Sequence, residues 1–500
     1  MQQKIATRTD RWMRIVIFAL LIAGAAIRLY IYLQNRNLII DEANVARNIY
    51  ERGFLSLLQP LDYEQYAPPV FLWITKLFSV LFGMGEMALR LYPFLCSLAA
   101  LWLFYKIVTE LMPIQVAWLP VSLLVFSGIF VRYSSELKQY MPDVFIALLL
   151  IFLALRINFE VHRRTRFVIY WMVIGTVAIW SSMPSVFVLA GVGCYYGWQV
   201  IARREYQKLQ SLVLISAIWV SQFLLYYFLL LQAQANSKYL QNFHQYDFLF
   251  ATPSTRSEWN HNWWVFSLLM RQFEGWYAYV HDINTAFLVA GTIMLARRAG
   301  ARFFLLVVPV LAVCVAAAFN QFSLMVRVSL FIIPVLMIII GYGFAQYYYL
   351  RFVWLKIPIL AAALYAAGCN IADLVEWRYK YEEITEGMAY FQDKKLPGVA
   401  VSIYQGSVPA FIYYTTIHPD KKQWTSLKDA DRIHWAINYD SLGWQMRHVW
   451  STRRPLGFIY TSATESEFRQ RHNQVSRHMA TIDSLNKPYV KAFIYIKPEE

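Results

Sequence analysis

Apolar runs of about 20 residues recur along the first three quarters of the chain and stop near Asp373. A helix of that length crosses a hydrocarbon core about 30 Å thick. Of the 500 residues, 58% are apolar or aromatic and only 15% are charged, against roughly a quarter charged in soluble domains. The sequence therefore predicts an α-helical polytopic membrane protein, followed by a more polar C-terminal part.

The apolar runs predict about eleven transmembrane helices, near residues 12–33, 88–110, 115–132, 143–160, 167–182, 184–200, 211–232, 283–297, 303–320, 326–348 and 353–372. The run 70–82 is too short to cross a bilayer, because Pro68-Pro69 precedes it and Gly83 follows it. We expect an interfacial helix there. The predicted organisation is a membrane part, 1–374, and a tail, 375–500.

Basic residues indicate the orientation of these spans, because cytoplasmic loops carry an excess of Lys and Arg. The basic clusters all fall on one side if the N-terminus is cytoplasmic; they are Lys4 to Arg14, His162 to Arg166, Arg203 to Lys208, Arg297 to Arg302, and Arg351 with Lys356. The predicted location is the cell (inner) membrane, with loops 34–87, 132–142 and 233–282 and the C-terminus on the periplasmic or other extracytoplasmic side. These clusters account for the net charge of +15 without a nucleic-acid partner.

The tail is predicted to be a small extracytoplasmic α/β domain. Its pattern indicates a polar helix 375–395, strands near 399–404, 432–438, 457–461 and 490–497, a short helix near 408–414 and a helix 464–482. No glycine-rich phosphate-binding loop accompanies the first strand, so we do not expect the tail to bind a nucleotide.

The first outer loop opens with the acidic pair Asp41-Glu42. Asp41 stands where a helix N-cap is expected, Glu42 suits the positive end of the helix dipole, and Gly53 is a plausible stop. Asp41 is therefore open to two interpretations, a helix cap or a catalytic base. They are compatible, because a carboxylate fixed at a helix start beside the bilayer is also well oriented.

An ordered series of motifs surrounds this pair: Arg28 late in the first span, Asp41-Glu42-Ala43, Tyr66-Ala67-Pro68-Pro69, Phe82-Gly83, and Glu86 to Leu91 leading into the next span. The series resembles glycosyltransferases of the GT-C superfold, which include protein O-mannosyltransferases and lipid A aminoarabinose transferases (family 39-like). The resemblance implies an inverting enzyme that moves a sugar from a polyprenyl-phosphate donor to an extracytoplasmic lipid, glycan or protein. The resemblance implies that Asp41 matches the family's loop carboxylate, a general base or acceptor-orienting group, with Glu42 beside it.

One motif departs from the resemblance. Tyr66-Ala67 stands where the aminoarabinose transferases carry Glu-Lys. The resemblance therefore carries over the class of enzyme and leaves the sugar and the acceptor open.

A polar loop and a separate arginine supply further candidate substrate ligands. The loop 132–142 is costly to place in the bilayer, at about 2.5–3.5 kcal/mol per charge at its centre, so Glu136, Lys138 and Asp143 need either headgroup contacts or a wet site. Arg327, ahead of a proline-containing span, resembles the family's donor-phosphate ligand or snorkels to the interface. The predicted site is catalytic Asp41 and Glu42 with substrate-binding Tyr66, Glu136, Lys138, Asp143 and Arg327.

No cofactor is assigned, and a divalent metal ion stays open. In the long outer loop, His261, Glu274, His281 and Asp282 match no metal-binding spacing. The Trp-rich helix after the capping box Thr255 to Glu258 is expected to belong to an interfacial belt. The alternative function is a transporter or flippase of lipid-linked glycans. It is less favoured because the halves show no convincing repeat and the charges cluster at the outer boundary.

Overall fold

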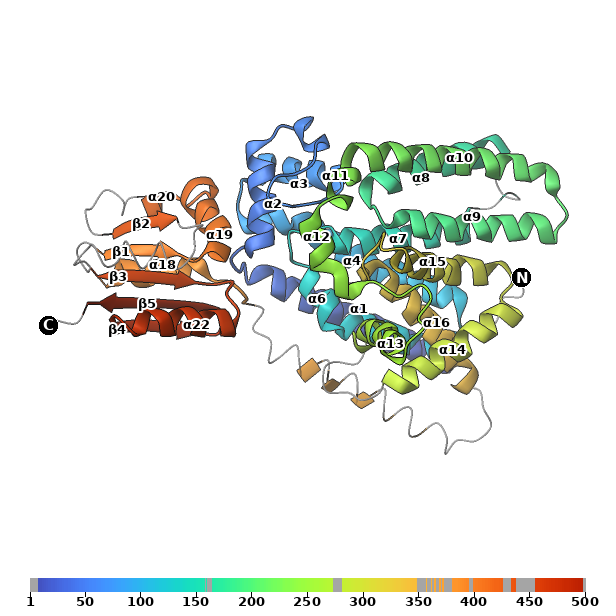
Figure 1. The fold of residues 1–500 in the computed structure, drawn as a ribbon. Coiled ribbons are helices and arrows are strands. Elements are labelled where there is room, and N and C mark those ends of the chain that lie inside the picture. Colours follow the sequence, from blue (N-terminus) through green and yellow to red (C-terminus); the bar gives the residue numbers. More distant parts are fainter. Residues whose placement is uncertain are drawn as a thin grey trace.

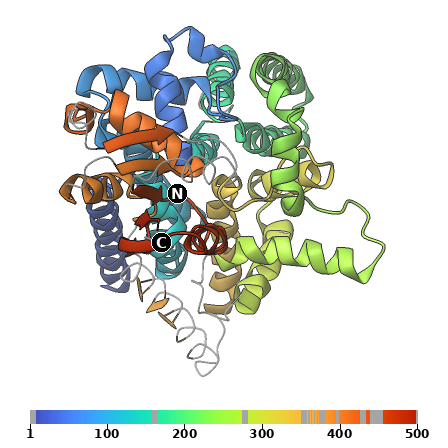
Figure 2. The ribbon, with the colours of Figure 1, turned by 60° about the vertical axis from the view of Figure 1, so that its left-hand side comes forward.

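A computed structural model describes residues 8–157, 159, 164–272, 281–348, 380–394, 399–425, 433–437 and 455–497, with scattered positions between 357 and 372. Figures 1 and 2 show a large helical part and, beside it, a smaller part built around a sheet. The two ends of the chain lie on opposite sides of the molecule in Figure 1.

The expected spans coincide with described helices as far as 348. These helices are α1 Arg8–Leu33, α4 Glu86–Leu111, α5 Ile114–Phe126, α6 Gly128–Tyr133, α7 Tyr140–Arg156, α8 Arg164–Ser181, α9 Ser185–Ala202, α10 Leu209–Tyr226, α14 His281–Arg298, α15 Ala301–Ala318 and α16 Ile333–Tyr348. The last expected span, 353–372, lies mostly outside the described residues.

By length and composition, 6 helices among the described residues are long and apolar enough to cross a membrane. The chain is thus an integral membrane protein, while the predicted count of eleven spans is not confirmed. The expected span 115–132 is broken at Ser127, where the extended backbone separates α5 from α6.

The loops expected on the outer side carry shorter helices: α2 Ile40–Glu51, α3 Pro69–Phe82, α11 Gln232–Ala235, α12 Lys238–His244 and α13 Arg256–Arg271. As predicted, α3 begins at the proline pair, and it ends at Gly83, whose φ of 87° few other residues adopt. The capping box at the start of α13 is confirmed, because Thr255 Oγ1 accepts from the Glu258 N–H and Glu258 accepts from Thr255 N–H.

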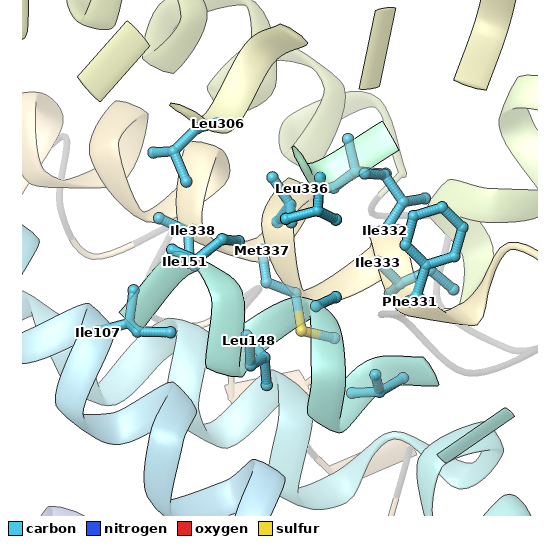
Figure 3. Close-up of a cluster of buried hydrophobic side chains, with 14 of the residues drawn as sticks. Ile107, Leu148, Ile151, Leu306, Phe331, Ile332, Ile333, Leu336, Met337 and Ile338 are labelled. Atoms are coloured by element: carbon cyan, nitrogen blue, oxygen red, sulfur yellow. The ribbon is translucent and has the colours of Figure 1, made fainter. Parts of the chain in front are cut away.

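The core of the helical part lies between α4, α7, α15 and α16. Figure 3 shows Ile107, Leu148 and Ile151 facing side chains of the segment Phe331–Ile338. These side chains are buried, as are nearly all residues on α16 between Ile333 and Ile340. A helix that is apolar on all sides and buried on all sides is the centre of a bundle.

The tail forms a 5-stranded sheet in the order β2-β1-β3-β5-β4. Its elements are α18 Ile384–Asp393, β1 Val399–Ile403, α19 Val408–Ile412, α20 Lys422–Thr425, β2 Ile433–Ile437, β3 Leu456–Tyr460, α22 Glu465–Ser476, β4 Ala480–Lys487 and β5 Val490–Ile496. Strands β1, β2 and β3 are parallel, and β5 pairs antiparallel with both β3 and β4.

Two tail elements differ from the prediction. The helix expected to run to residue 482 ends at Ser476, and β4 follows it. β4 is a polar edge strand without apolar alternation, held by its pairing with β5, so its own sequence gave no strand signal. The polar helix expected over 375–395 is described only in part: 375–379 lie outside the described residues, 380–383 are not helical, and α18 begins at Ile384.

One hydrophobic cluster joins the tail to the first outer loop. It contains Ala43, Val45 and Ile49 of α2 together with Phe411 of α19 and Ile459 of β3. Both views show α19 against α2. The outer loop that carries the acidic pair therefore packs against the sheet region as well as against the bundle.

Helices α14 and α16 approach each other through glycines. A methyl group on Gly343 would overlap the carbonyl oxygen of Phe287, and one on Gly291 would overlap that of Ile339. Small residues at such a crossing let helix backbones come close inside a membrane.

Gly343→Ala is expected to destabilise the protein by about 1–3 kcal/mol, because the two helices must separate to admit the methyl group. The matched control is Gly193→Ala on α9, where the added methyl group meets nothing within 4 Å. The control is expected to be neutral or slightly stabilising, because Ala favours helix over Gly. Thermal unfolding in detergent measures both variants. Equal melting temperatures for the two would contradict the close crossing.

Candidate active site

The start of α2 places the acidic pair in two different settings. The helix begins at Ile40, and Ile39 before it is extended, with φ −75° and ψ 167°. Glu42, at the third helical position, accepts a hydrogen bond from the Ile39 N–H at 3.1 Å. Asp41 is therefore the second residue of the helix, and the prediction that it is the N-cap is wrong. Its side chain is left available for other contacts.

Glu42 lies at the centre of a buried ion-pair network. Its oxygens accept from Arg36 at 2.8 Å and from Arg90 at 2.7 and 2.8 Å. The backbone N–H of Leu137 donates to it at 2.7 Å. Burial opposes its ionisation, but Arg36 and Arg90 outweigh burial and hold the pKa of Glu42 below its usual range. Glu42 is 0% exposed and does not line the pocket described below.

Asp41 faces a different set of partners. Its Oδ2 lies 3.3 Å from an Arg327 nitrogen and 3.9 Å from Lys138 Nζ, and its Oδ1 accepts from Gln65 Nε2 at 3.4 Å. The side chain is 29% exposed. Lys138 first, and Arg327 and Gln65 after it, lower the pKa of Asp41 against the opposing effect of burial. The carboxyl group is therefore ionised at neutral pH.

Gln65 and Lys138 hold each other in place beside Asp41. Lys138 Nζ donates to Gln65 Oε1 at 2.5 Å, and the backbone oxygen of Gln65 accepts from Gln234 on α11 at 2.7 Å. Burial lowers the pKa of Lys138, while Asp41 opposes that shift. A buried ammonium group next to a carboxylate is a strong but adjustable source of positive charge.

Asp41, Lys138 and Arg327 open onto one pocket with a volume of about 700 Å³. One part of its wall is polar and the other part is apolar. The lining residues are Ile40, Asp41, Asn44, Tyr63, Glu64, Gln65, Tyr66, Lys138, Gln139, Tyr140, Asp143, Met183, Pro184, Gln234, Tyr239, Leu240, Phe243, His244, Phe322, Arg327 and Val328. They come from elements far apart in sequence, with α12 supplying one side.

The other predicted site residues divide between the pocket and its surroundings. Tyr66 and Asp143 line the pocket, and the Tyr66 hydroxyl bonds that of Tyr226. Glu136 does not line it, and pairs instead with Arg132 at 3.3 Å and Arg36 at 3.9 Å.

Arg28, late in α1, is buried beside the end of α5. It is 1% exposed and donates to the carbonyls of Leu124 and Val125 near the end of α5. A guanidinium group there satisfies carbonyls that the helix end leaves without intrahelical partners.

No three His, Cys, Asp or Glu side chains among the described residues gather closely enough to hold a metal ion. His261 bonds the carbonyl of Phe248 at 2.9 Å. Glu274 lies outside the described residues.

Sequence reasoning missed Gln65, Arg36 and Asn44. Gln65 precedes a recognised motif by one residue, and Asn44 lies one turn beyond Asp41 on the same helix face, so both could have been suggested by position. Arg36 carried no local signal, because its partners Glu42 and Glu136 come together only in the fold.

Comparison with known proteins adds the following. Residues 66–239 match the family model described as dolichyl-phosphate-mannose-protein mannosyltransferase. A search of curated protein sequences gave no match. The structure of ArnT from Cupriavidus metallidurans bound to undecaprenyl phosphate aligns with a TM-score of 0.51 at 13% identity, covering 95% of this chain and 97% of that one. The apo state of the same protein gives 0.51 at 14%, covering 98% of each chain.

A third structure, the Archaeoglobus fulgidus oligosaccharyltransferase with Zn and sulfate, aligns with a TM-score of 0.44 at 12% identity over 80% of this chain and 61% of that one. The resemblance inferred from the sequence is confirmed by the family match and by the two ArnT structures, and the chain has the GT-C glycosyltransferase fold.

Proposed function

We propose that this protein is an inverting glycosyltransferase that moves a sugar from a polyprenyl-phosphate donor to an extracytoplasmic acceptor, with Asp41 as general base. One observation carries the proposal. A partly exposed, ionised carboxylate shares a pocket with two cations, and both cations approach the same oxygen of that carboxylate.

The charges in the pocket suit an anionic donor. Lys138 and Arg327 together carry two positive charges against the single negative charge of Asp41. A donor phosphate can therefore take both cations as partners, and charge-assisted bonds of this kind are the strong ones in proteins. The apolar part of the wall, with Met183, Pro184 and Phe322, offers a surface for the first isoprene units.

The transfer step follows from this arrangement. The acceptor hydroxyl oxygen forms a bond to the anomeric carbon while the bond from that carbon to the phosphate oxygen breaks. The hydroxyl proton passes to Asp41, and polyprenyl phosphate leaves with the electron pair of the broken bond. Lys138 and Arg327 stabilise the charge that develops on the departing phosphate. Their engagement by phosphate also weakens their hold on Asp41, which raises its basicity when the base is needed.

Hydrogen-bond acceptors on the wall suit the sugar. Among the described residues, no donor reaches Asn44 Oδ1, Gln139 Oε1 or Asp143 Oδ1, although all three atoms are buried. An unpaired buried acceptor is costly, so a ligand with several hydroxyl donors is favoured at this wall. We infer that these three side chains bind hydroxyl groups of the transferred sugar.

Three findings outside the pocket support the proposal. Residues 66–239 match a family of sugar transferases, and the fold is shared with a protein crystallised with undecaprenyl phosphate. The arrangement of basic clusters favours an extracytoplasmic position for Asp41. We extend the use of a polyprenyl-phosphate donor to this chain as part of the proposal.

Asp41→Asn is expected to slow transfer by at least about 10²-fold, because an amide cannot accept the proton. The fold should persist, since Asp41 is not the helix cap. Turnover of radiolabelled polyprenyl-phosphate sugars by purified protein measures the effect. Asp62→Asn is the matched control: Asp62 lies in the same outer loop, pairs with Arg52 and does not line the pocket.

Glu42→Gln distinguishes the role of Glu42 from that of its neighbour Asp41. It removes a charge from a buried network, which typically costs about 3–5 kcal/mol, so loss of folded protein is expected.

Near-normal turnover by Asp41→Asn would remove Asp41 as the base. Tight donor binding by the wild type without turnover on any acceptor would favour a flippase.

The pH dependence of kcat/KM tests which cation controls Asp41. Asp41 accepts a proton only when ionised, so activity is lost as pH falls through its pKa. Because Lys138 lowers that pKa most and Arg327 lowers it less, Lys138→Met should move the acid limb to higher pH, and Arg327→Met should move it by a smaller amount. Both variants should also weaken donor binding. Lys106→Met on α4, outside the pocket, is the control. If the wild type and these three variants all lost activity at the same acidic pH, control of the Asp41 pKa by Lys138 and Arg327 would be contradicted.

A further inference from the structure

Three of the four backbone N–H groups in the segment 37–40, which leads into α2, donate to residues of the tail. The N–H of Asn37 donates to Glu383 at 3.3 Å, that of Leu38 to the Tyr414 hydroxyl at 2.9 Å, and that of Ile40 to Glu382 at 2.9 Å. The N–H of Ile39 alone in this segment bonds locally, to Glu42. These acceptors lie more than 340 residues further along the chain.

The first helical N–H of α2, that of Ile40, needs an acceptor from outside the helix. A helix leaves its first backbone N–H groups without intrahelical partners, and Ser, Thr, Asp or Asn at the N-cap usually bonds one of them. α2 has Ile39 at that position, and an aliphatic side chain has no oxygen to offer. Glu382 supplies a carboxylate oxygen to the first helical N–H, one residue before Asp41.

Further contacts fix the segment that carries Glu382. Thr385 donates from its N–H and its hydroxyl to Asn37 Oδ1, both at 2.9 Å. The ring of Tyr381 lies under the guanidinium groups of Arg132 and Arg36, at 4.4 and 5.6 Å. The tail segment 381–385 is therefore bound on both sides of Glu382 to residues that surround the start of α2.

We propose that Glu382 is a positioning residue for the Asp41 site: it caps α2 from the tail by accepting from the first helical N–H and so fixes the orientation of Asp41 in the pocket. This inference rests on the proposed function for its kinetic consequence only, because the capping itself is independent of the reaction. It also gives the tail a role in catalysis without any contact between tail and substrate.

The pH dependence of kcat distinguishes a positioning role of Glu382 from a purely structural one, because Glu382 ionises. Burial, together with Asp41 and Glu42, raises the pKa of Glu382 to about 8, while the Ile40 N–H and Arg36 oppose the shift. Below that pH the neutral carboxyl group still accepts through its carbonyl oxygen. Above it the ionised group makes a stronger, charge-assisted bond to Ile40 and raises the basicity of Asp41. Wild-type kcat should therefore rise on passing through about pH 8.

The experiment compares Glu382→Ala, Glu382→Gln and the matched control Glu386→Gln. Glu386 lies in the same tail segment but pairs with Lys380 and Lys487, away from α2. Hydrogen–deuterium exchange of the peptide covering 37–43 reports the cap without any substrate. Glu382→Ala should speed exchange of this peptide about 5- to 10-fold, the loss expected for a helix cap. Glu382→Gln, which keeps an acceptor oxygen, should stay close to wild type, as should Glu386→Gln.

The kinetic arm uses the same proteins with a polyprenyl-phosphate sugar donor. Glu382→Ala should lower kcat about 10-fold with donor KM nearly unchanged, since it alters the orientation of the base and no phosphate contact. Glu382→Gln should keep most of kcat at neutral pH but lose the rise near pH 8. If Glu382→Ala does not fold, the missing rise in Glu382→Gln decides the question.

Three results would overturn the inference: unchanged exchange in Glu382→Ala, faster exchange with normal kcat, or a rise near pH 8 that persists in Glu382→Gln. A wild-type protein that turns over no lipid-linked sugar would instead refute the proposed function. The exchange arm would in that case still decide whether Glu382 caps α2.

Discussion

The ion-pair network of the buried Glu42 carboxylate is the interaction on which the region around the start of α2 depends. It joins the start of α2 to Arg90 on α4, to Arg36 in the preceding loop and to the backbone at Leu137. A charge without exposure to solvent is stable only when its partners are complete, because loss of one partner leaves the others buried and unpaired. The network therefore fixes the relative positions of two outer loops and the helix that begins between them.

This constraint explains how two adjacent acidic residues acquire different properties. Glu42 has every oxygen occupied and is closed to substrate, whereas Asp41 points into a pocket and holds its cations at 3.3 and 3.9 Å. In the proposed function a donor phosphate takes over the two cations beside Asp41, whereas Arg36 and Arg90 stay bound to Glu42. Environments that separate the behaviour of neighbouring titratable groups are typical of acid–base sites. The fold thus supplies one carboxylate with a complete set of partners and, in the proposed function, a second one for chemistry.

The sequence predicted the helical membrane part, the position of most helices, the motifs around Asp41 and several pocket residues, because these depend on local hydrophobicity and on recognisable order. It did not predict contacts that form only between distant segments. Asp41 looked like the cap because Ile39 has no side-chain oxygen. The N–H groups of Ile39 and Ile40 in fact donate to Glu42, inside the helix, and to Glu382, in the tail. β4 was missed for the same reason: a polar edge strand is defined by its partner β5. The grouping of Glu136 with the site was a consequence of sequence proximity to Lys138.

A structure of the protein with bound undecaprenyl phosphate tests the central claim most directly. The account predicts that the phosphate lies between Lys138 and Arg327, within hydrogen-bond reach of both, and that the Arg327 contact with Asp41, now 3.3 Å, has lengthened beyond ion-pair distance. The lipid chain should follow the apolar wall near Met183 and Phe322. A phosphate bound elsewhere, with the contacts of Asp41 unchanged, would contradict it.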